Sequence, residues 1–516
     1  MTTPPSHPPV IWPGLPQRLH QAINPWLLSQ PDAPCVQDDQ YALSYRQFDA
    51  ATQMAAQRLS ALGVRAGDRV LLVAENCVAL AVLFFAASRL DAWACVINAR
   101  LSPAELDSIR QHAGARLVCY VGHTAPTLAH AQADHAEDGG FEHIGTVAVS
   151  AVDLTVHAEP SYAESHEQVA ALIYTSGTSG SPKGVMLTHH NLLFVGDTQR
   201  RNRSLTPQDR AYVVLPLTHV YGLASVLIGT LCSGGSLLLA ARFNPEDVVR
   251  AWRDEGITVM HGVSAMYAKL LEWSRETDQA LPVQGLRIAQ SGGGGLSQSL
   301  KADFENTTGL TLHLGYGMTE AAPTVAQTLL HAPRTDTSSG VVIPGVDIVR
   351  VGKDDQPLPP GEVGEVWVRG PNVMKGYYRD PVQTAATLGA DGWLRTGDLG
   401  VQDQEGNLTI VGRAKEMIIR SGFNVYPAEV EGTLNAHPLV LQSAVVGREV
   451  QDNEEIVAFV EPVAGAALTA ELLIAWVRTH LSAYKVPSVV VIMPALPAGA
   501  TGKILKNVLK QQAIHV

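Results

Sequence analysis

The chain has 516 residues, a net charge of −12, and a composition that is 46% hydrophobic and 17% charged. This length exceeds what one hydrophobic core usually serves, so we expect two or more domains, and the composition excludes a disordered chain. An acidic chain without a basic stripe is a poor partner for nucleic acid. The five cysteines are scattered and form no C-x-x-C pair, which predicts reduced thiols in a cytoplasmic protein.

No segment of the sequence predicts secretion or membrane insertion. The proline-rich start, residues 1–16, lacks the charged and apolar regions of a signal peptide. The longest apolar run, residues 78–88, falls far short of the about 20 residues that cross a bilayer. We therefore expect a core helix there and no transmembrane segment.

Strand and helix patterns alternate along the first part of the chain. Apolar strands are predicted at 69–75, 94–97 and 116–121, with helices at 78–90 and 102–112. Such βαβ alternation predicts a parallel sheet flanked by helices.

A glycine-rich loop at residues 174–184, Tyr-Thr-Ser-Gly-Thr-Ser-Gly-Ser-Pro-Lys-Gly, separates two strand-like segments. Its backbone N–H groups and hydroxyls can hold phosphate oxygens, its glycines allow close approach, and Lys183 adds a compact positive charge. The loop lacks the Gly-x-x-x-x-Gly-Lys-Ser/Thr spacing of the ordinary P-loop. A flexible surface loop is the structural alternative, and the particular spacing favours phosphate binding.

The alternation of predicted strands and helices then resumes. Strands are predicted at 210–215, 236–240, 258–262 and 286–290, and helices at 222–232, 245–255 and 265–273. From about residue 341, short strands with Gly, Pro and Asp turns (346–351, 365–369, 408–412) predict a small β subdomain. A compact α/β unit of about a hundred residues follows from about residue 415.

Several later segments carry side chains suited to chemistry. His219, in Leu-Pro-Leu-Thr-His-Val-Tyr-Gly (215–222), ends a predicted strand, where ligands of parallel sheets bind; a satisfied core histidine is the alternative. In Leu-Gly-Tyr-Gly-Met-Thr-Glu (314–320), Tyr316 offers a stacking face and Glu320 a hard oxygen ligand for Mg²⁺. A third segment, 392–399, contains the carboxylate of Asp398.

These motifs, in this order, resemble the adenylate-forming superfamily of acyl-CoA synthetases, peptide-synthetase adenylation domains and firefly luciferase. The resemblance extends from Leu43 to Lys506. It implies an α/β fold with a large N-terminal domain of doubly wound sheets, including the β subdomain at about 341–412, and a small mobile α+β C-terminal domain. The implied boundaries are 1–412, a hinge at 413–416, and 417–516.

The resemblance also implies the site residues. Lys503, in Ala-Thr-Gly-Lys-Ile-Leu-Lys (500–506), is the expected adenylation lysine, acting with Glu320 and Lys183, and Thr175 is expected to help Glu320 hold Mg²⁺. The implied ATP-binding residues are Thr175, Ser176, Gly177, Thr178, Ser179, Gly180, Gly293, Gly294, Tyr316, Gly317, Thr319, Asp398 and Arg413. The implied acyl-pocket residues are His219, Val220, Tyr221, Gly315 and Ala322, with Ser225 and Pro323 nearby. The implied hinge and CoA-tunnel residues are Lys415, Ser421, Gly422 and Phe423.

Two departures from the family pattern are informative. The family usually has Gly-Gly-Ala-Pro-Leu where this chain has Gly294 and Gly295 in place of alanine and proline, so we expect a more mobile loop. Peptide-synthetase domains carry an aspartate for the amino group near residues 215–222, and none occurs there. An amino acid substrate is therefore disfavoured.

The implied function is an AMP-forming ligase that uses ATP, Mg²⁺ and coenzyme A. The expected pocket is neutral and mostly apolar, which predicts a hydrophobic acid. Residues 421–427 are similar to bacterial medium- and long-chain fatty acyl-CoA ligases, whereas 315–321 and 220–221 are similar to plant 4-coumarate:CoA ligases. We rank a fatty acid first and an aryl acid second. An acyl-AMP ligase that delivers to a carrier protein, a luciferase-like oxygenase and a non-catalytic nucleotide-binding module remain alternatives, and a homodimer remains open.

Overall fold

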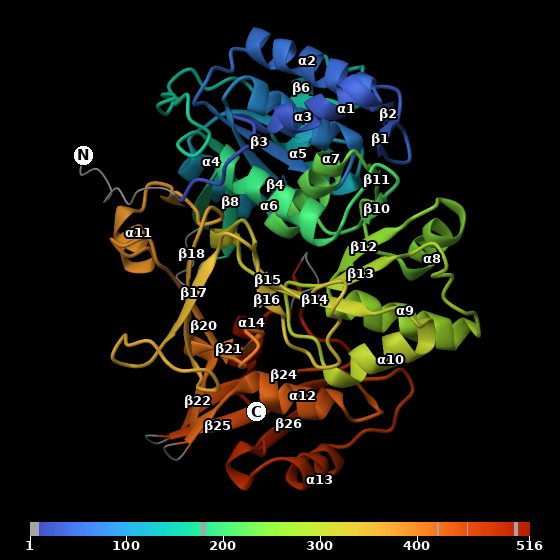
Figure 1. The fold of residues 1–516 in the computed structure, drawn as a ribbon, viewed down its shortest axis with the longest axis vertical. Helices are drawn as coiled ribbons and strands as arrows, with labels where there is room; N and C mark the ends of the chain where they lie inside the picture. The colour runs from blue at the N-terminus through green and yellow to red at the C-terminus, as the bar shows by residue number, and fades with distance from the viewer. Residues whose placement is uncertain (1–9, 177–181, 421–422, 451–452, 500–503) are drawn as a thin grey trace.

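The computed structural model describes residues 10–176, 182–420, 423–450, 453–499 and 504–516 (Figure 1). Three sheets of nine, eight and four strands form a large N-terminal part. Two small sheets, of two and three strands, form a C-terminal part at the lower end of the view. The expected α/β class with a large N-terminal and a small C-terminal domain is confirmed.

The nine-stranded sheet has a parallel centre and antiparallel edges. Its strands, in spatial order, are β16 (Val341–Val342), β15 (Thr324–Gln327), β14 (Leu312–Gly317), β13 (Ile288–Ser291), β12 (Val259–Gly262), β10 (Arg210–Val213), β11 (Ser236–Leu239), β1 (Pro34–Gln37) and β2 (Ala42–Ser44). The strands from β14 to β1 are parallel, and β2, β15 and β16 are antiparallel to their neighbours.

The eight-stranded sheet carries the glycine-rich hairpin. Its strands, in spatial order, are β19 (Gly376–Tyr377), β9 (Pro182–Thr188), β8 (Val169–Ser176), β4 (Trp93–Asn98), β3 (Arg69–Ala74), β5 (Ala115–Val121), β7 (Val147–Val149) and β6 (Glu137–Asp138). The predicted parallel βαβ unit is its centre, because β8, β4, β3 and β5 are parallel.

Helices cover both of these sheets. They are α1 (Asn24–Ser29), α2 (Tyr45–Ala61), α3 (Val78–Arg89), α4 (Pro103–Ala113), α5 (Ala125–Ala133), α6 (His189–Asn202), α7 (Gly229–Ser233), α8 (Pro245–Asp254), α9 (Ser264–Thr277) and α10 (Gln298–Thr308), with short 3-10 turns η1 (Leu19–Ile23) and η3 (Thr319–Ala321). Every residue from Val78 to Ser88 of α3 is buried, as the apolar run predicts. No described helix has the length and apolar character needed to cross a membrane.

Asn76 connects the two large sheets. It follows β3 of the eight-stranded sheet, and its Nδ2 donates to the carbonyl oxygens of Val213 (3.2 Å), Leu215 (3.0 Å) and Ala240 (3.1 Å). Its Oδ1 accepts from the backbone N–H of Leu217 at 2.8 Å. Buried polar groups need hydrogen-bond partners. The hydrogen bonds of Asn76 fix the loop that leads to the predicted acyl pocket.

A π-helix, η2 (Tyr221–Ile228), follows that loop and continues into α7. The sequence predicts an ordinary helix at 222–232. A Cβ at Gly222 would lie 2.4 Å from the carbonyl oxygen of Pro216, so only glycine permits this close approach. Wider π turns occur often at functional sites.

A four-stranded antiparallel sheet follows: β17 (Asp347–Val351), β18 (Gly364–Arg369), β20 (Leu394–Gln402) and β21 (Leu408–Arg413). Two strands within the range 341–412 belong elsewhere, because β16 pairs with β15 and β19 pairs with β9. The helix α11 (Pro381–Thr387) follows β19.

The C-terminal part begins after a single turn, η4 (Ala414–Glu416). Its elements are β22 (Ile418–Arg420), β23 (Phe423–Val425), α12 (Pro427–Asn435), β24 (Val440–Val450), β25 (Asn453–Pro462), α13 (Ala470–His480), η5 (Ala483–Lys485), β26 (Val489–Ile492) and α14 (Lys506–Ala513). It has hydrophobic clusters of its own on both faces of the three-stranded sheet. The hydroxyl of Ser299 on α10 donates to the carbonyl of Asn435 on α12 at 2.9 Å and links the two parts.

Candidate active site

The β8–β9 hairpin presents Thr175 and Lys183 side by side. The two residues are paired directly across the hairpin, and both side chains are partly buried. The backbone of Ser176 belongs to β8. The other predicted phosphate-loop residues, Gly177, Thr178, Ser179 and Gly180, lie outside the described residues.

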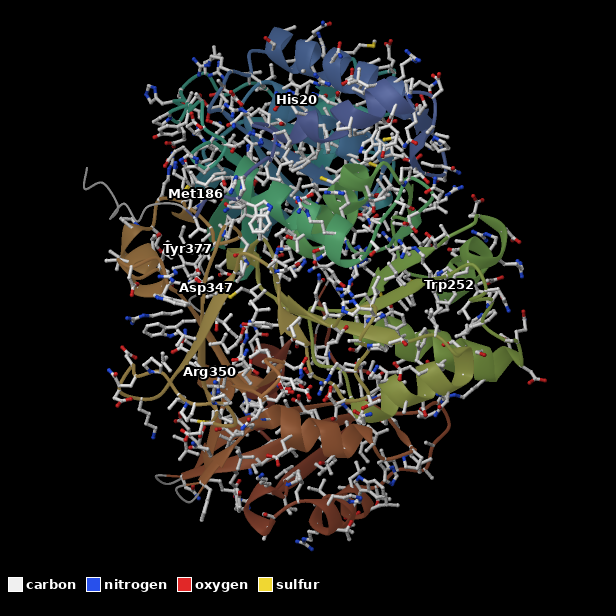
Figure 2. All side chains as sticks on the ribbon, viewed as in Figure 1. His20, Met186, Trp252, Asp347, Arg350 and Tyr377 are labelled. Atoms are coloured by element: carbon white, nitrogen blue, oxygen red, sulfur yellow. The ribbon has the colours of Figure 1, made fainter. Side chains whose placement is uncertain are left out.

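Tyr377 joins Lys183 to Glu320. The strand β19 adds to the edge of β9, pairing Gly376 with Met186 and placing Tyr377 beside the hairpin, as Figure 2 shows. The Nζ of Lys183 lies 5.5 Å from the centre of the Tyr377 ring, and the Tyr377 hydroxyl donates to Oε1 of Glu320 at 2.8 Å. Two residues predicted from distant motifs therefore converge on one tyrosine.

The immediate surroundings of this cluster are polar. Lys183 also donates to Oε1 of Gln383 on α11 at 3.2 Å. Burial and the charge of Glu320 raise the pKa of Tyr377 well above its usual value, so its hydroxyl stays a donor. The backbone carbonyl of Glu320 accepts from the N–H of Met374 at 2.9 Å, which fixes the 3-10 turn that carries the carboxylate.

Asp398 is the centre of a second cluster. It lies on β20, is only 4% exposed, and is paired in register with Arg413 on β21. The Tyr316 hydroxyl donates to Oδ2 of Asp398 at 2.6 Å, and Nε of Arg413 lies 3.0 Å from Oδ1. Burial, and next the Asp398 charge, raise the pKa of Tyr316 far above its usual value. Both carboxylate oxygens are thereby oriented.

One short segment connects the two clusters. Tyr316 is the next-to-last residue of β14, which ends at Gly317, and Glu320 lies with Thr319 in the 3-10 turn that follows. A Cβ at Gly317 would lie 2.1 Å from the Pro323 carbonyl oxygen, so this position requires glycine. The predicted nucleotide motif 314–320 therefore connects the hairpin side with the Asp398 side.

The predicted acyl-pocket residues lie at the start of η2 and just before it, on β14 and directly after η3. Nδ1 of His219 accepts from the backbone N–H of Tyr221 at 3.2 Å, at the start of the π-helix. A Cβ at Gly292 would lie 2.9 Å from the Tyr221 ring, so this ring packs directly against the glycine loop. Val220 is fully buried and Ala322 is fully buried with a left-handed φ of 59°. Gly315 lies on β14.

The glycine loop after β13 has room for side chains. Gly293 has a φ of +77°, whereas a Cβ at Gly294 or Gly295 would meet nothing within 4 Å. The Ser264 hydroxyl donates to the Gly295 carbonyl at 2.7 Å and anchors the end of the loop. The greater mobility expected of this loop stays a prediction.

The predicted hinge and CoA-tunnel residues lie apart from the two clusters. Lys415 is exposed in η4. Phe423 stacks on Tyr484 of the same C-terminal part, with ring centres 4.6 Å apart. Neither of these observations links Lys415 or Phe423 to Tyr377. Ser421, Gly422 and Lys503 lie outside the described residues.

The donor set suits Mg²⁺ rather than a transition metal. Within the described ranges, no group of three or more His, Cys, Asp or Glu side chains could hold a metal by itself. Mg²⁺ needs only one or two protein carboxylates when phosphates and waters supply the rest. One oxygen of Glu320 accepts a hydrogen bond from Tyr377, and a carboxylate oxygen is the kind of ligand that Mg²⁺ prefers.

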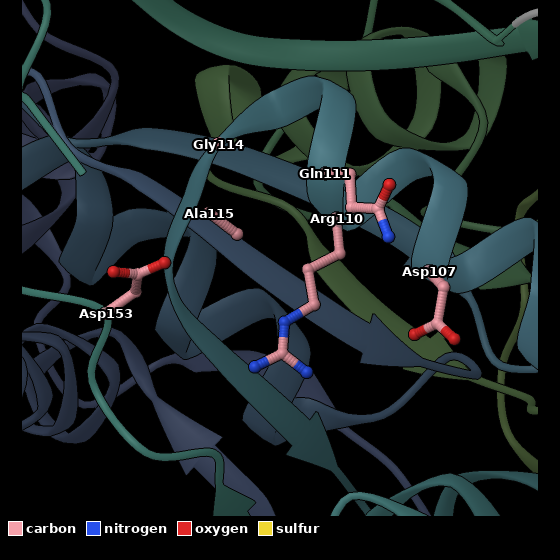
Figure 3. A pocket seen from close by; sticks show the side chains of 6 residues that line it. All are labelled: Asp107, Arg110, Gln111, Gly114, Ala115 and Asp153. Carbon is pink, nitrogen blue, oxygen red and sulfur yellow. The ribbon is translucent and has the colours of Figure 1, made fainter. Parts of the chain in front are cut away.

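A surface cavity of about 380 Å³ lies elsewhere, near the C-terminal end of α4 (Figure 3). It is lined by Asp107, Arg110, Gln111, Gly114, Ala115 and Asp153. Arg110 is already paired with Asp134, with Nη1 and Oδ1 2.8 Å apart. None of the predicted site residues lines it.

Comparisons with known proteins show the family to which this chain belongs. The "AMP-binding enzyme" family matches residues 25–378, and the "AMP-binding enzyme C-terminal domain" matches 429–503. A feruloyl-CoA synthase of Amycolatopsis sp is 34% identical over 96% of this chain and 99% of its own. A 4-coumarate–CoA ligase 3 of Oryza sativa subsp. japonica is 32% identical (92% and 89%), and a long-chain-fatty-acid–CoA ligase of Escherichia coli is 30% identical (93% and 92%).

Solved structures that are similar in fold support the same family. ATP-bound MatB from Rhodopseudomonas palustris matches with a TM-score of 0.84 and 29% identity, over 96% of this chain and 99% of that chain. The O-succinylbenzoate coenzyme A synthetase MenE from Bacillus subtilis, in complex with ATP and magnesium ion, matches with a TM-score of 0.80 and 28% identity (95% and 99%). The chain therefore belongs to the AMP-binding enzyme family, within the adenylate-forming superfamily of acyl-CoA synthetases.

Proposed function

We propose that this chain is an AMP-forming ligase that activates a carboxylic acid with ATP and transfers the acyl group to coenzyme A. The observation that carries the proposal is the convergence of Lys183 and Glu320 on Tyr377. A lysine from a glycine-rich hairpin and a carboxylate from a second motif lie close together. The phosphates of a bound nucleotide need both a positive charge and a ligand for Mg²⁺.

The chemistry explains why these groups are needed. A carboxylate is a poor acyl donor because its leaving group would be oxide. Its attack on the α-phosphorus of ATP expels pyrophosphate and leaves an acyl-adenylate, in which AMP is the leaving group. The protein contributes in-line positioning and charge neutralisation. We assign β- and γ-phosphate binding to Thr175, the loop 176–180 and Lys183.

Bound Mg²⁺, held by Glu320 with help from Thr175, would neutralise charge on the phosphates. Asp398 would accept the two ribose hydroxyls. Its two oxygens are already oriented by Tyr316 and Arg413, which supports this role, because a pre-oriented carboxylate loses little freedom on binding. The Tyr316 ring and the backbone at Gly293 and Gly294 would flank the adenine.

The second half-reaction needs a thiol and a different position of the C-terminal domain. The CoA thiol attacks the acyl carbon and releases AMP, so no cysteine nucleophile of the chain is required. We propose that the C-terminal domain turns at 413–416, withdrawing Lys503 and bringing the Gly422 loop to the pantetheine. Rigid-body rotation at a short hinge is a known type of switch. The single turn η4, which contains Lys415, is the only regular element between β21 and β22 in the described chain.

For the acid, we now rank an aryl acid first and a medium- or long-chain fatty acid second, reversing the order that the sequence favours. Two of the three relatives named above act, by their names, on aromatic acids, and the third on fatty acids. The aromatic ring of Tyr221, which packs against Gly292, would also suit stacking with an aromatic acid.

The test measures the two half-reactions separately. Pyrophosphate release should require an acid, and thioester should appear only with CoA. Lys503→Ala should abolish adenylation and leave thioester formation from preformed acyl-AMP within about twofold of wild type. Lys510→Ala, an exposed lysine on α14, is the matched control. Equal loss of both half-reactions in Lys503→Ala would contradict the proposed rotation of the C-terminal domain between the half-reactions. If the protein consumed no ATP with any acid, the whole proposal would be contradicted.

A further inference from the structure

The turn η3, which carries Glu320, is held by one later segment of the chain, residues 371–377. The backbone N–H of Met374 donates to the Glu320 carbonyl oxygen at 2.9 Å. The Tyr377 hydroxyl donates to Oε1 of the same residue at 2.8 Å. The segment therefore contacts both the backbone and the carboxylate of Glu320, so the groups that fix the segment also orient this carboxylate.

Asn372 ties the start of the segment to the far end of the same turn. Its Nδ2 donates at 2.8 Å to the carbonyl oxygen of Thr324, the first residue of β15. The Asn372 side chain is fully buried, and its Oδ1 has no hydrogen-bond partner among the described residues. A buried acceptor without a partner costs free energy of desolvation. Stability alone is therefore a poor reason for an asparagine at this position.

Asn191 holds the segment from the other side. Its Nδ2 donates to the carbonyl oxygens of Pro371 at 2.8 Å and of Val373 at 2.9 Å, the two neighbours of Asn372 in the chain. Its Oδ1 accepts from the backbone N–H of Thr188 at 2.9 Å. Because the amide group uses its donors and its acceptor in these bonds, Asn191 fixes the backbone on both sides of Asn372.

The same asparagine connects the segment with the glycine-rich hairpin. The strand β9 carries Lys183 near its start and ends at Thr188, and Asn191 lies in the first turn of α6, directly after that strand. The hydrogen bonds of Asn191 therefore link the strand that carries the lysine with the segment that orients Glu320. Such a link matters for catalysis, because a misplacement of about 1 Å can lower a rate about 100-fold.

We propose that Asn191 and Asn372 are positioning residues for the first half-reaction, because they hold the Glu320 carboxylate in the orientation in which it binds Mg²⁺. The proposal rests on the proposed function, since it takes Glu320 as the Mg²⁺ ligand, and it adds two residues that act through Glu320. The competing explanation is a purely structural role, in which the two asparagines only stabilise the N-terminal part. That explanation predicts no specific effect on Mg²⁺.

Binding of a nucleotide that cannot react tests the proposal without catalysis. The probe is an ATP analogue with a methylene group between the α- and β-phosphorus, titrated by calorimetry in Mg²⁺ and in EDTA. For the wild type we expect Mg²⁺ to lower the Kd of the analogue by about tenfold or more. For Asn191→Ala and Asn372→Leu we expect this gain to fall to about threefold or less, whereas the Kd in EDTA should stay within about twofold.

The half-reactions give a second measurement. Acid-dependent pyrophosphate release should fall about 5- to 20-fold in each variant, whereas thioester formation from preformed acyl-AMP, which releases no pyrophosphate, should stay within about twofold. In a Glu320→Gln background, Asn372→Leu should cost less than about twofold more, because the group that it positions is already impaired. The matched control is Asn407→Ala, since this buried amide donates to Asp403 instead. It should keep the wild-type gain from Mg²⁺.

Several results would overturn the proposal. They are an unchanged gain from Mg²⁺ in both variants, no gain in the wild type, equal losses of the two half-reactions, and a full additional loss in the Glu320→Gln background. If Asn191→Ala does not fold, Asn372→Leu decides the question, because it keeps most of the side-chain volume and removes an unpaired acceptor. Failure of both variants to fold would mean a structural role. A wild-type protein that consumes no ATP with any acid would instead overturn the proposed function.

Discussion

Tyr377 shows how a single hydroxyl can organise a charged site. It lies between the Lys183 ammonium and the Glu320 carboxylate, on a strand that enters the hairpin edge from almost 200 residues later in the chain. Lys183 and Glu320 were predictable because each is part of a motif whose spacing is chemically specific. Tyr377 was not, because a Gly-Tyr-Tyr run has no local property that distinguishes a site residue from a core residue.

We predict that Tyr377→Phe lowers kcat/KM for acid-dependent pyrophosphate release by about tenfold, since losing one hydrogen bond to a charged group costs about 1.4 kcal/mol. The loss should shrink at high Mg²⁺ if the hydroxyl orients Glu320 for the cation. The control is Tyr378→Phe, because the neighbouring hydroxyl donates to Glu159 at 2.5 Å instead. Equal effects of the two variants, or a loss insensitive to Mg²⁺, would contradict this role.

The acyl pocket illustrates the limit of residue-by-residue prediction. Tyr221, Gly315 and Ala322 suggest a mostly apolar lining, which stays a prediction. The buried polar row of His261, Gln290 and His313 was not predicted, because these residues belong to three different strands and only the sheet register aligns them. A histidine or glutamine inside an apolar strand was the available signal.

At the level of elements, the strands and helices of the βα units were predictable within a few residues, because apolar runs and capping residues mark them. The strand β20, which carries Asp398, was not. Its sequence Leu-Arg-Thr-Gly-Asp-Leu-Gly contains two glycines and an aspartate, residues that local propensity assigns to turns. Pairing with β18 and β21 on both sides overrides that propensity.

The glycine loop after β13 offers a prediction at this scale. Gly294→Ala should raise the free energy of unfolding by about 0.4 to 1 kcal/mol, because its Cβ meets open space and alanine has fewer unfolded conformations. Gly293→Ala should lower it by about 1 kcal/mol, because its φ is +77°. Urea unfolding of the two variants checks both. Equal signs would mean that the loop conformation differs from the one described.

Across the whole molecule, several histidines are kept neutral by burial. The pKa values of His20, His190 and His313 are lowered to about 4, that of His261 to about 3, and that of His189 well below its usual value. Burial is the main cause in each case. Because each folded-state pKa lies below the unfolded value of 6.5, the unfolded chain binds more protons between about pH 4 and 6.5. Stability should therefore be complete above pH 6.5 and fall as the solution is acidified.

His190 provides the measurement. Its Nε2 accepts from the backbone N–H of Trp12 at 2.9 Å, so protonation would break that bond. Between pH 6 and 5, His190→Gln should reduce the slope of unfolding free energy against pH by about 1.4 kcal/mol per unit, the contribution of one proton. His157→Gln, at an exposed position, is the control variant. An unaltered slope in His190→Gln would show that protonation of this histidine does not contribute to the loss of stability at low pH.

The two parts of the chain are joined by few contacts, and the linker itself is tied to the smaller part. Lys506 on α14 pairs with Glu416 in η4 at 3.2 Å and with Glu431 on α12 at 2.7 Å. Any rotation of the C-terminal domain would therefore carry Glu416 with it and concentrate the backbone change at residues before it. No local sequence pattern predicts this ion pair, because its members lie up to 90 residues apart.

The pairing of β19 with β9 has a consequence for how the protein is made. The ribosome releases the glycine-rich hairpin long before residues 376 and 377 emerge, so during synthesis the hairpin has an unpaired edge. Nascent chains shorter than that would lack the tyrosine that contacts both the lysine and the glutamate, and the proposed nucleotide site would be incomplete in them. ATP could therefore favour the folded state only late in translation, when about three quarters of the polypeptide has appeared.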